Sequence, residues 1–300
     1  MKRAVAAAMA VATVLVTAAA VPAAHAGGPA RLRLAGARPI PIEYFQGLTH
    51  DRAGARFFAG VAVALYRTDH ALRRRAQVPD SIPPTVRATF AFNHVGDLTW
   101  DPSGGGRLIL PLECFTPGAP NGGNTCGQGG LGVAGPATLA THYVVPLDPR
   151  DIAKAMWAEA SPDGRLVWTS AGADLIAYRT ADISAANAAA GVRIRPVVRL
   201  HGAVPPSGVT GAAFLRGRLL LAGQATGPLE IWSVDLRTGA RRRLVALRVV
   251  GESEGLDAVN AGRGLVRLIV TPFQTGGRRP TYGVGHNELL SFVPASGRGT

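Results

Sequence analysis

The stretch GDLTWDPSGGGRLIL at residues 96–110 decides the fold of this 300-residue chain. An apolar segment, a turn rich in Pro, Ser and Gly, and a second apolar segment are typical of two paired β-strands. The same strand–turn–strand pattern recurs about every 50 residues, which is the spacing of a repeat architecture. Its five copies begin at Gln46, Gly96, Met156, Thr210 and Glu254.

A short alternating segment follows each copy and is interpreted as the third strand of the unit. These segments are residues 63–69, 142–148, 175–182, 229–235 and 288–294. One four-stranded sheet cannot bury both of its faces alone, but sheets arranged radially pack against each other. We therefore predict an all-β protein, a β-propeller of five four-stranded blades, with six blades as the alternative if residues 115–150 contain a degenerate unit. A β-sandwich would explain regularly spaced turns but not the matched third strands.

The N-terminal strand at residues 30–40 has no partner of its own, and the last unit ends after residue 294. We expect this strand to join the last blade and close the ring, because closure removes a free sheet edge. The arginine triplets at 73–75 and 241–243 each follow a third strand. Charged residues on an exposed outer strand prevent edge-to-edge pairing, so we place both triplets there.

The first 26 residues predict a secretory signal peptide. Lys2 and Arg3 precede an apolar run, and small residues surround the expected cleavage after Ala26. A membrane anchor is the alternative, but no second apolar segment approaches the ~18–20 residues of a spanning helix. We therefore expect a secreted protein whose residues 27–300 form one propeller domain, without membrane insertion after signal cleavage.

The formal net charge is +13, carried almost entirely by arginine, since Lys2 and Lys154 are the only lysines. Such a balance can mark a polyanion partner. We interpret it as a solvated, compositionally biased face, and expect a monomer whose partner is a small-molecule ligand or a protein surface, not a nucleic acid.

Two cysteines in an exported chain predict one disulfide, Cys114–Cys126. The segment at about 115–140 is rich in Gly, Pro and Asn and predicts a loop inserted in blade two. A loop of this length is often functional, so we expect the disulfide to hold it over one mouth of the channel, with a plain surface excursion as the alternative.

The residues at the start of each inner strand are the candidates to meet at the channel mouth. Carboxylates with few opposing charges favour a hard cation such as Ca²⁺, whereas the alternative is that they satisfy backbone amides and water. We predict Asp97 and Glu254 as metal ligands and His94 and Glu252 as catalytic residues. The predicted ligand contacts are Tyr44, Gln46, Lys154 and Trp157.

The copies starting at Gly96 and Glu254 resemble the inner strands of the gluconolactonase and strictosidine-synthase-like propellers, which read approximately Glu-Gly-Pro-x-Trp-Asp before a glycine turn. The resemblance implies a divalent metal on Glu254, which Gly255 follows. Val95 stands at the matching place in blade two, and the family's Asn and Asp ligands from the middle blades have no match. The segment SEGLD at 253–257 also resembles the Glu-Gly-Leu element of phytase-type esterase-like propellers.

The segment Gly251–Gly255 matches G-x-S-x-G, the nucleophile elbow of α/β-hydrolases. An elbow requires a strand, a sharp turn and a helix, but the residues that follow predict a short segment, two glycines and a strand. We therefore reject the elbow, although Asp257 and His286 lie downstream in the right order. The remaining histidines are interpreted as blade or turn residues: His50, His70, His142 and His201.

Two functions follow from these patterns. The favoured one is an exported propeller that binds a small ligand or a partner at the channel mouth without catalysis. The alternative is a divalent-metal-dependent hydrolase of the lactonase or esterase type, in which Asp97 and Glu254 hold a metal that activates water and His94 or Glu252 is the general base. The alternative requires that the carboxylates of Asp97, Glu252 and Glu254 face one pocket.

Overall fold

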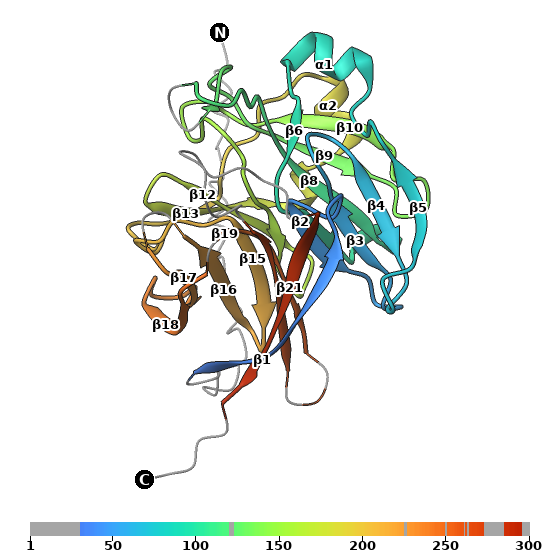
Figure 1. Ribbon diagram of the computed structural model, residues 1–300. Coiled ribbons are helices and arrows are strands. Elements are labelled where there is room, and N and C mark those ends of the chain that lie inside the picture. Colours follow the sequence, from blue (N-terminus) through green and yellow to red (C-terminus); the bar gives the residue numbers. More distant parts are fainter. Residues whose placement is uncertain are drawn as a thin grey trace, which may run out of the picture.

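Five antiparallel sheets form a ring in the computed structural model, so the protein is a five-bladed β-propeller (Figure 1). This confirms the predicted all-β fold and its blade count. The structure describes residues 31–119, 123–224, 227–249, 251–260, 262, 264–272 and 285–295. The predicted signal peptide lies outside these residues. No helix in the described part of the chain is long and apolar enough to cross a membrane.

Each blade is built from the inner strand outward. Blade one holds β2 (Gly47–His50), β3 (Arg56–Ala59), β4 (Leu65–Thr68) and β5 (Arg74–Val78). Blade two has an interrupted inner strand, β6 (His94–Val95) and β7 (Thr99–Asp101), followed by β8 (Arg107–Glu113), β9 (Gly130–Ala134) and β10 (Thr141–Pro146). Blade three holds β11 (Glu159–Ala160), β12 (Leu166–Ala171), β13 (Asp174–Arg179) and β14 (Val198–Leu200).

Blade four holds β15 (Gly211–Leu215), β16 (Arg218–Gly223), β17 (Leu229–Val234) and β18 (Arg241–Leu247). Blade five holds β19 (Gly251–Val259), β20 (Leu265–Pro272), β21 (His286–Pro294) and, outermost, β1 (Leu32–Pro41). Two short helices, α1 (Pro84–Phe90) and α2 (Ala185–Ala189), lie in connections between strands.

The N-terminal strand closes the ring, as predicted. β1 runs antiparallel to β21 from Leu32, opposite Pro294, to Pro41, opposite His286. In Figure 1 the two strands, which come from opposite ends of the chain, lie side by side. Blade five is therefore complete only when both ends of the domain are in place.

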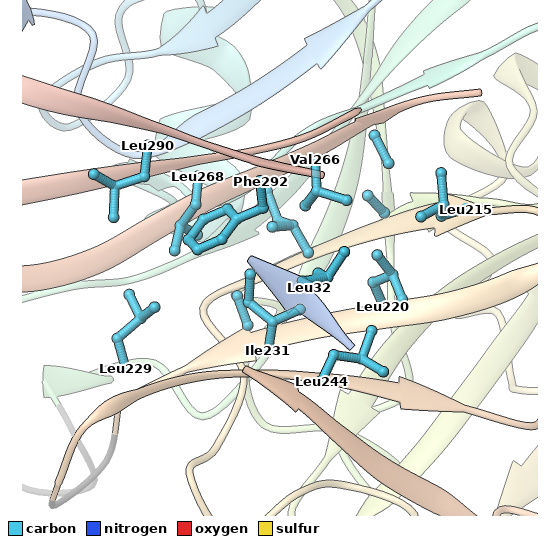
Figure 2. Close-up of a cluster of buried hydrophobic side chains, with 14 of the residues drawn as sticks. Leu32, Leu215, Leu220, Leu229, Ile231, Leu244, Val266, Leu268, Leu290 and Phe292 are labelled. Atoms are coloured by element: carbon cyan, nitrogen blue, oxygen red, sulfur yellow. The ribbon is translucent and has the colours of Figure 1, made fainter. Parts of the chain in front are cut away.

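The hydrophobic core is divided into five clusters, one between each pair of neighbouring blades. The two-residue period of a strand produces this division. In β16, for example, Leu219 and Leu221 face blade three, whereas Leu220 and Ala222 face blade five. Figure 2 shows the cluster between blades four and five, with Leu32 of β1 among its members.

The arginine triplets lie where the sequence predicted them, on the outermost strands β5 and β18. In blade one, Asp69 pairs with Arg73 and Arg75 at the turn that leads into β5. The side chains of these arginines are largely exposed, consistent with protected sheet edges.

Blade two differs from the prediction in its third strand. Residues 142–148 were assigned to that strand, but Thr141–Pro146 form the outermost strand, and Gly130–Ala134 form the third. The strand lies inside the segment predicted as a loop at 115–140, because a Gly-rich composition conceals a fully buried strand in which Gly132 packs against leucines of β8. The insertion therefore ends before residue 130.

We expect Ile40→Ala in β1 to lower the free energy of unfolding by about 2–4 kcal/mol, because Ile40 is 3% exposed in the cluster that joins blade five to blade one. Leu34→Ala is the matched control, since Leu34 lies in the same strand but is 43% exposed, and it should change stability by less than ~0.5 kcal/mol. Urea unfolding of both variants measures the difference. Equal effects would show that β1 does not stabilise the ring through its buried face.

Candidate functional site

Asp97 occupies the axis of the propeller, where the inner strand of blade two is interrupted. Three residues, 96–98, stand opposite only two residues of β8, which makes a β-bulge. Bulges redirect a side chain, and here the bulge turns Asp97 inward, where it is 1% exposed.

The carboxylate of Asp97 accepts hydrogen bonds from three blades. Its Oδ1 accepts from the amide of Leu48 in blade one at 3.0 Å. Its Oδ2 accepts from Ala212 in blade four at 2.9 Å and from Leu256 in blade five at 3.2 Å. Burial raises the pKa of Asp97 well above its usual range, and the three amides oppose that shift only in part.

The backbone of Asp97 reaches the remaining blade. Its amide donates to the carbonyl of Met156 at 3.0 Å, and its carbonyl accepts from Ala158 at 2.9 Å. This contact forms a parallel bridge between blades two and three. Gly96 permits it, since a Cβ there would lie 1.9 Å from the Met156 oxygen. Asp97 thus connects all five inner strands.

A cavity of about 790 Å³ lies directly beside Asp97 at one mouth of the channel. We call it the Glu254 mouth. Asp97, Glu252 and Glu254 all line it, as the hydrolase alternative requires, although both carboxylate oxygens of Asp97 are directed to backbone amides. The predicted residues that line it are Gln46, His94, Asp97, Glu252 and Glu254, together with Thr210 from the start of the fourth inner strand.

Glu254 also sits in a bulge. In the pairing of β19 with β20, Glu254 and Gly255 together oppose Ile269 alone. The side chain is 8% exposed, lines the cavity, and has no hydrogen bond or ion pair with any residue that the structure describes. Burial raises the pKa of Glu254 well above its usual range, and the charges of Glu252 and Asp97 raise it further. An unpartnered carboxyl group therefore forms part of the cavity wall.

His94 faces the same cavity from blade two. Its Nδ1 lies 3.1 Å from Oε1 of Glu113, a buried residue on the neighbouring strand β8. The His94 ring packs against the ring of Phe115 at a centroid distance of 5.1 Å. The His94–Glu113 contact does not have hydrogen-bond geometry, so the imidazole is held in the wall mainly by packing against Phe115.

The disulfide shapes the rim of this mouth. Cys114 and Cys126 are bonded, as predicted, and close the insertion that begins at Phe115. Phe115, Pro117 and Gly118 of the insertion line the cavity. The insertion therefore lies over the channel mouth and is more than a surface excursion.

Three predicted ligand contacts lie elsewhere. Tyr44 is 1% exposed and stacks on Phe58 at 4.4 Å in the core between blades five and one. Trp157 is fully buried, and its Nε1 donates to Ser170 Oγ at 2.8 Å. These two assignments are corrected, because the aromatic rings fill the spaces between blades. Lys154 lines a neighbouring cavity instead of the Glu254 mouth.

The metal assignment for Asp97 and Glu254 stays a prediction that this geometry does not favour. A hard cation such as Ca²⁺ needs roughly 6–8 oxygen ligands, but both oxygens of Asp97 already accept amides. Among the described residues, no group of three or more His, Cys, Asp or Glu side chains is arranged to hold a metal ion. We derive no chemical step through a metal.

The opposite end of the channel carries polar residues that sequence reasoning missed. A smaller cavity of about 240 Å³ is lined there by His50, Glu159 and Asp257, among others, and we call it the Glu159 mouth. His50 Nδ1 lies 2.6 Å from Asp257 Oδ1. Glu159 accepts from Thr99 Oγ1 at 2.8 Å and from the amide of Phe214 at 3.0 Å. The His50–Asp257 contact joins blade one to blade five. The two hydrogen bonds of Glu159 join blade three to blades two and four.

The pKa values of two residues at the Glu159 mouth, Glu159 and His50, are raised. Burial raises the pKa of Glu159 to about 8, although its two hydrogen bonds oppose the shift. Burial alone would lower the pKa of His50, but the hydrogen bond and the charge of Asp257 outweigh it and raise that pKa. The residues lie at the far ends of inner strands, so the alternating pattern could have located them if both ends had been considered.

The rejected nucleophile elbow is a strand. Gly251–Val259 form β19, and Ser253 is fully buried within it. Its hydroxyl lies 3.0 Å from Thr210 Oγ1, which ties blade five to blade four.

Comparison with known proteins yields similarity of fold alone. No protein-family model and no curated protein matches the sequence. The glutaminyl cyclase of Myxococcus xanthus has a similar structure, with a TM-score of 0.54 and 11% identity over 90% of this chain and 100% of that one. A glucose-dehydrogenase-like putative oxidoreductase of Thermus thermophilus follows, with a TM-score of 0.48 and 13% identity over 86% and 100% of the two chains. The aldose sugar dehydrogenase of Streptomyces coelicolor reaches a TM-score of 0.41 with 11% identity over 89% and 99%.

Asp97→Ala should cost about 3–5 kcal/mol of stability, because three buried amides lose their acceptor. If this variant does not fold, Asp97→Asn should still fold with a smaller loss, since it retains one acceptor oxygen. Asp163→Ala is the control, because its side chain is 60% exposed and ties only its own turn. A loss for Asp97→Ala no larger than that of Asp163→Ala, measured by urea unfolding, would contradict the role of Asp97.

Glu159→Gln should become more stable relative to the parent protein as pH rises. The folded-state pKa of about 8 lies above the ordinary value of 4.5 for the unfolded chain. The neutral acid therefore stabilises the folded state fully below pH 4.5, and this stabilisation is lost as the pH rises to about 8. The two proteins should match near pH 5 and diverge by pH 8 in urea unfolding. The exposed Glu43→Gln should show no such divergence. A constant difference across this range would contradict the assignment.

Proposed function

We propose that this protein is an exported β-propeller that binds a small molecule through a cationic group at the Glu254 mouth, without catalysis. The observation that carries the proposal is the Glu254 carboxyl group, which is nine-tenths buried, lines a cavity of about 790 Å³ and has no partner among the described residues. A buried polar group without a partner is costly, and a ligand that supplies one recovers that cost. Export is compatible with the disulfide.

The surroundings of Glu254 favour a cation over an anion. Glu252, Asp97 and Glu113 also line the cavity, and His94 stands beside Glu113. An amine or guanidine would be attracted by this local excess of carboxyl groups, although the whole chain is basic.

The cavity also offers apolar contact for the rest of such a ligand. Val61, Phe115 and Met156 line it from blades one, two and three. Its volume lies within the range of about 300–1,000 Å³ that is usual for small-molecule sites. An amine with an apolar body fits these walls best.

A second candidate function is hydrolysis of a small ester or lactone. The observation in its favour is the position of His94 in the cavity wall, 3.1 Å from the buried Glu113 carboxylate, where the imidazole would act as a general base. In this form the reaction uses no metal. Ester hydrolysis by the parent protein that His94→Gln abolishes would support this candidate over simple binding.

Amine binding should depend on pH in a defined direction. Burial raises the pKa of Glu254, whereas a bound cation favours the ionised carboxylate, so binding lowers that pKa and is coupled to proton release. Affinity for hexylamine should therefore rise with pH and level off above the pKa of the free carboxyl group. Titration calorimetry in buffers of different ionisation enthalpy should register the released proton.

Glu254→Gln should weaken hexylamine binding by at least ~10-fold and remove its pH dependence, because the ionised partner is lost. Glu43→Gln, an exposed glutamate on the way into blade one, is the matched control and should bind as the parent does. Failure of amines to bind at millimolar concentration, or equal affinity in Glu254→Gln, would overturn the proposal.

A further inference from the structure

A second cavity adjoins the Glu254 mouth. It has a volume of about 510 Å³ and lies between blades three and four. Met156 and Thr210 line both cavities, so the two share a wall. We call the second one the Lys154 cavity, after the single lysine in its lining.

Lys154 is the basic residue of that cavity. The residue is half-buried and makes no ion pair or side-chain hydrogen bond within the described ranges. The one acid in the lining, Asp151, is already paired, with Arg195 at 2.9 Å and Arg199 at 3.2 Å. The cavity therefore presents a net positive charge to an occupant.

The same cavity holds two buried polar atoms that lack a partner. These are Ser207 Oγ and Gln224 Oε1. The Ser207 hydroxyl can donate to an anionic oxygen, whereas Gln224 Oε1 accepts from a donor group. The hydroxyl therefore suits an acidic ligand group beside Lys154.

We propose that the two cavities form one bipartite site for a dipolar molecule, with its cationic group at Glu254 and its anionic group at Lys154. This inference rests on the proposed function, because it assigns the second half of the same ligand. Glu254 and Lys154 line different cavities, which have Met156 and Thr210 in common. The ligand must therefore carry its two charges several bonds apart, as an ω-amino acid or a short peptide does and an α-amino acid does not.

The complementarity excludes other simple charge patterns for this ligand. A diamine would place a cation beside Lys154, and a dicarboxylate would place an anion beside Glu254 and Asp97. Each of these contacts is repulsive, so both classes should bind less tightly than the dipolar molecule of equal length.

The test compares hexylamine with aminocaproate, a molecule of the same carbon number in which a carboxylate replaces the terminal methyl group. Aminocaproate should bind the parent protein roughly 3- to 10-fold more tightly by calorimetry at low salt. Lys154→Met should remove that advantage, whereas Lys154→Arg should retain it. A length series from aminobutyrate to aminocaprylate, with triglycine as a peptide, should show an optimum.

Three results would overturn the inference in distinguishable ways. If aminocaproate binds no better than hexylamine, the bipartite site is wrong and the cation site stands. A dipolar ligand that occupies both cavities must displace hexylamine from one and caproate from the other. If aminocaproate displaces neither of them, the two cavities do not form one site. If hexylamine does not bind at all, the proposed function fails, and this inference fails with it.

Discussion

The hydrogen bonds of one buried carboxylate, Asp97, constrain the whole ring. Five sheets that each bury two faces need their inner strands at a common axis, yet strand edges there carry amides that water cannot reach. Asp97 accepts three of those amides with its side chain and joins the remaining blade through its backbone. The blade-to-blade clusters supply the bulk of apolar burial, but this side chain sets how closely the strands approach.

The close approach of the inner strands requires small residues at the contacts, and it removes water from nearby carboxyl groups. Gly255 meets the backbone of blade one so closely that a Cβ would lie 2.4 Å from the Leu48 amide. In this dry interior, carboxyl groups lose solvation, and the pKa of Glu254 and of Glu159 is raised at the two mouths. The difference between the mouths lies in their partners. Glu159 is hydrogen-bonded between blades, whereas Glu254 faces open space.

The fold was predictable from sequence because strand period, turn composition and repeat spacing agree with each other. The ring closure by β1 followed from a strand without a partner. The third strand of blade two was assigned wrongly, since GLGVA at 130–134 has the composition of a loop and becomes a strand only through packing against β8. Tertiary context overrides local preference in such segments.

The candidate site was predictable in position and less so in detail. The start of each inner strand correctly placed Gln46, His94, Glu252 and Glu254 around one cavity. Tyr44 and Trp157 occupy equivalent sequence positions but are buried between blades. An aromatic residue there could equally contact a ligand, and the sequence pattern does not distinguish the two cases. The bulges that aim Asp97 and Glu254 inward change register by one residue, which periodicity does not reveal.

The Glu254 mouth and the Glu159 mouth are two separate cavities, and the buried Asp97 lines only the first. If the Glu254 mouth binds a ligand as proposed, the selection of that ligand comes from the rim of this cavity. Two parts of that rim break the five-fold repeat: the disulfide-closed insertion of blade two and the bulge of blade five. The insertion contributes the ring of Phe115, and the bulge contributes the carboxyl group of Glu254. The propeller supplies the frame, and these departures from its symmetry supply the chemistry that a ligand meets.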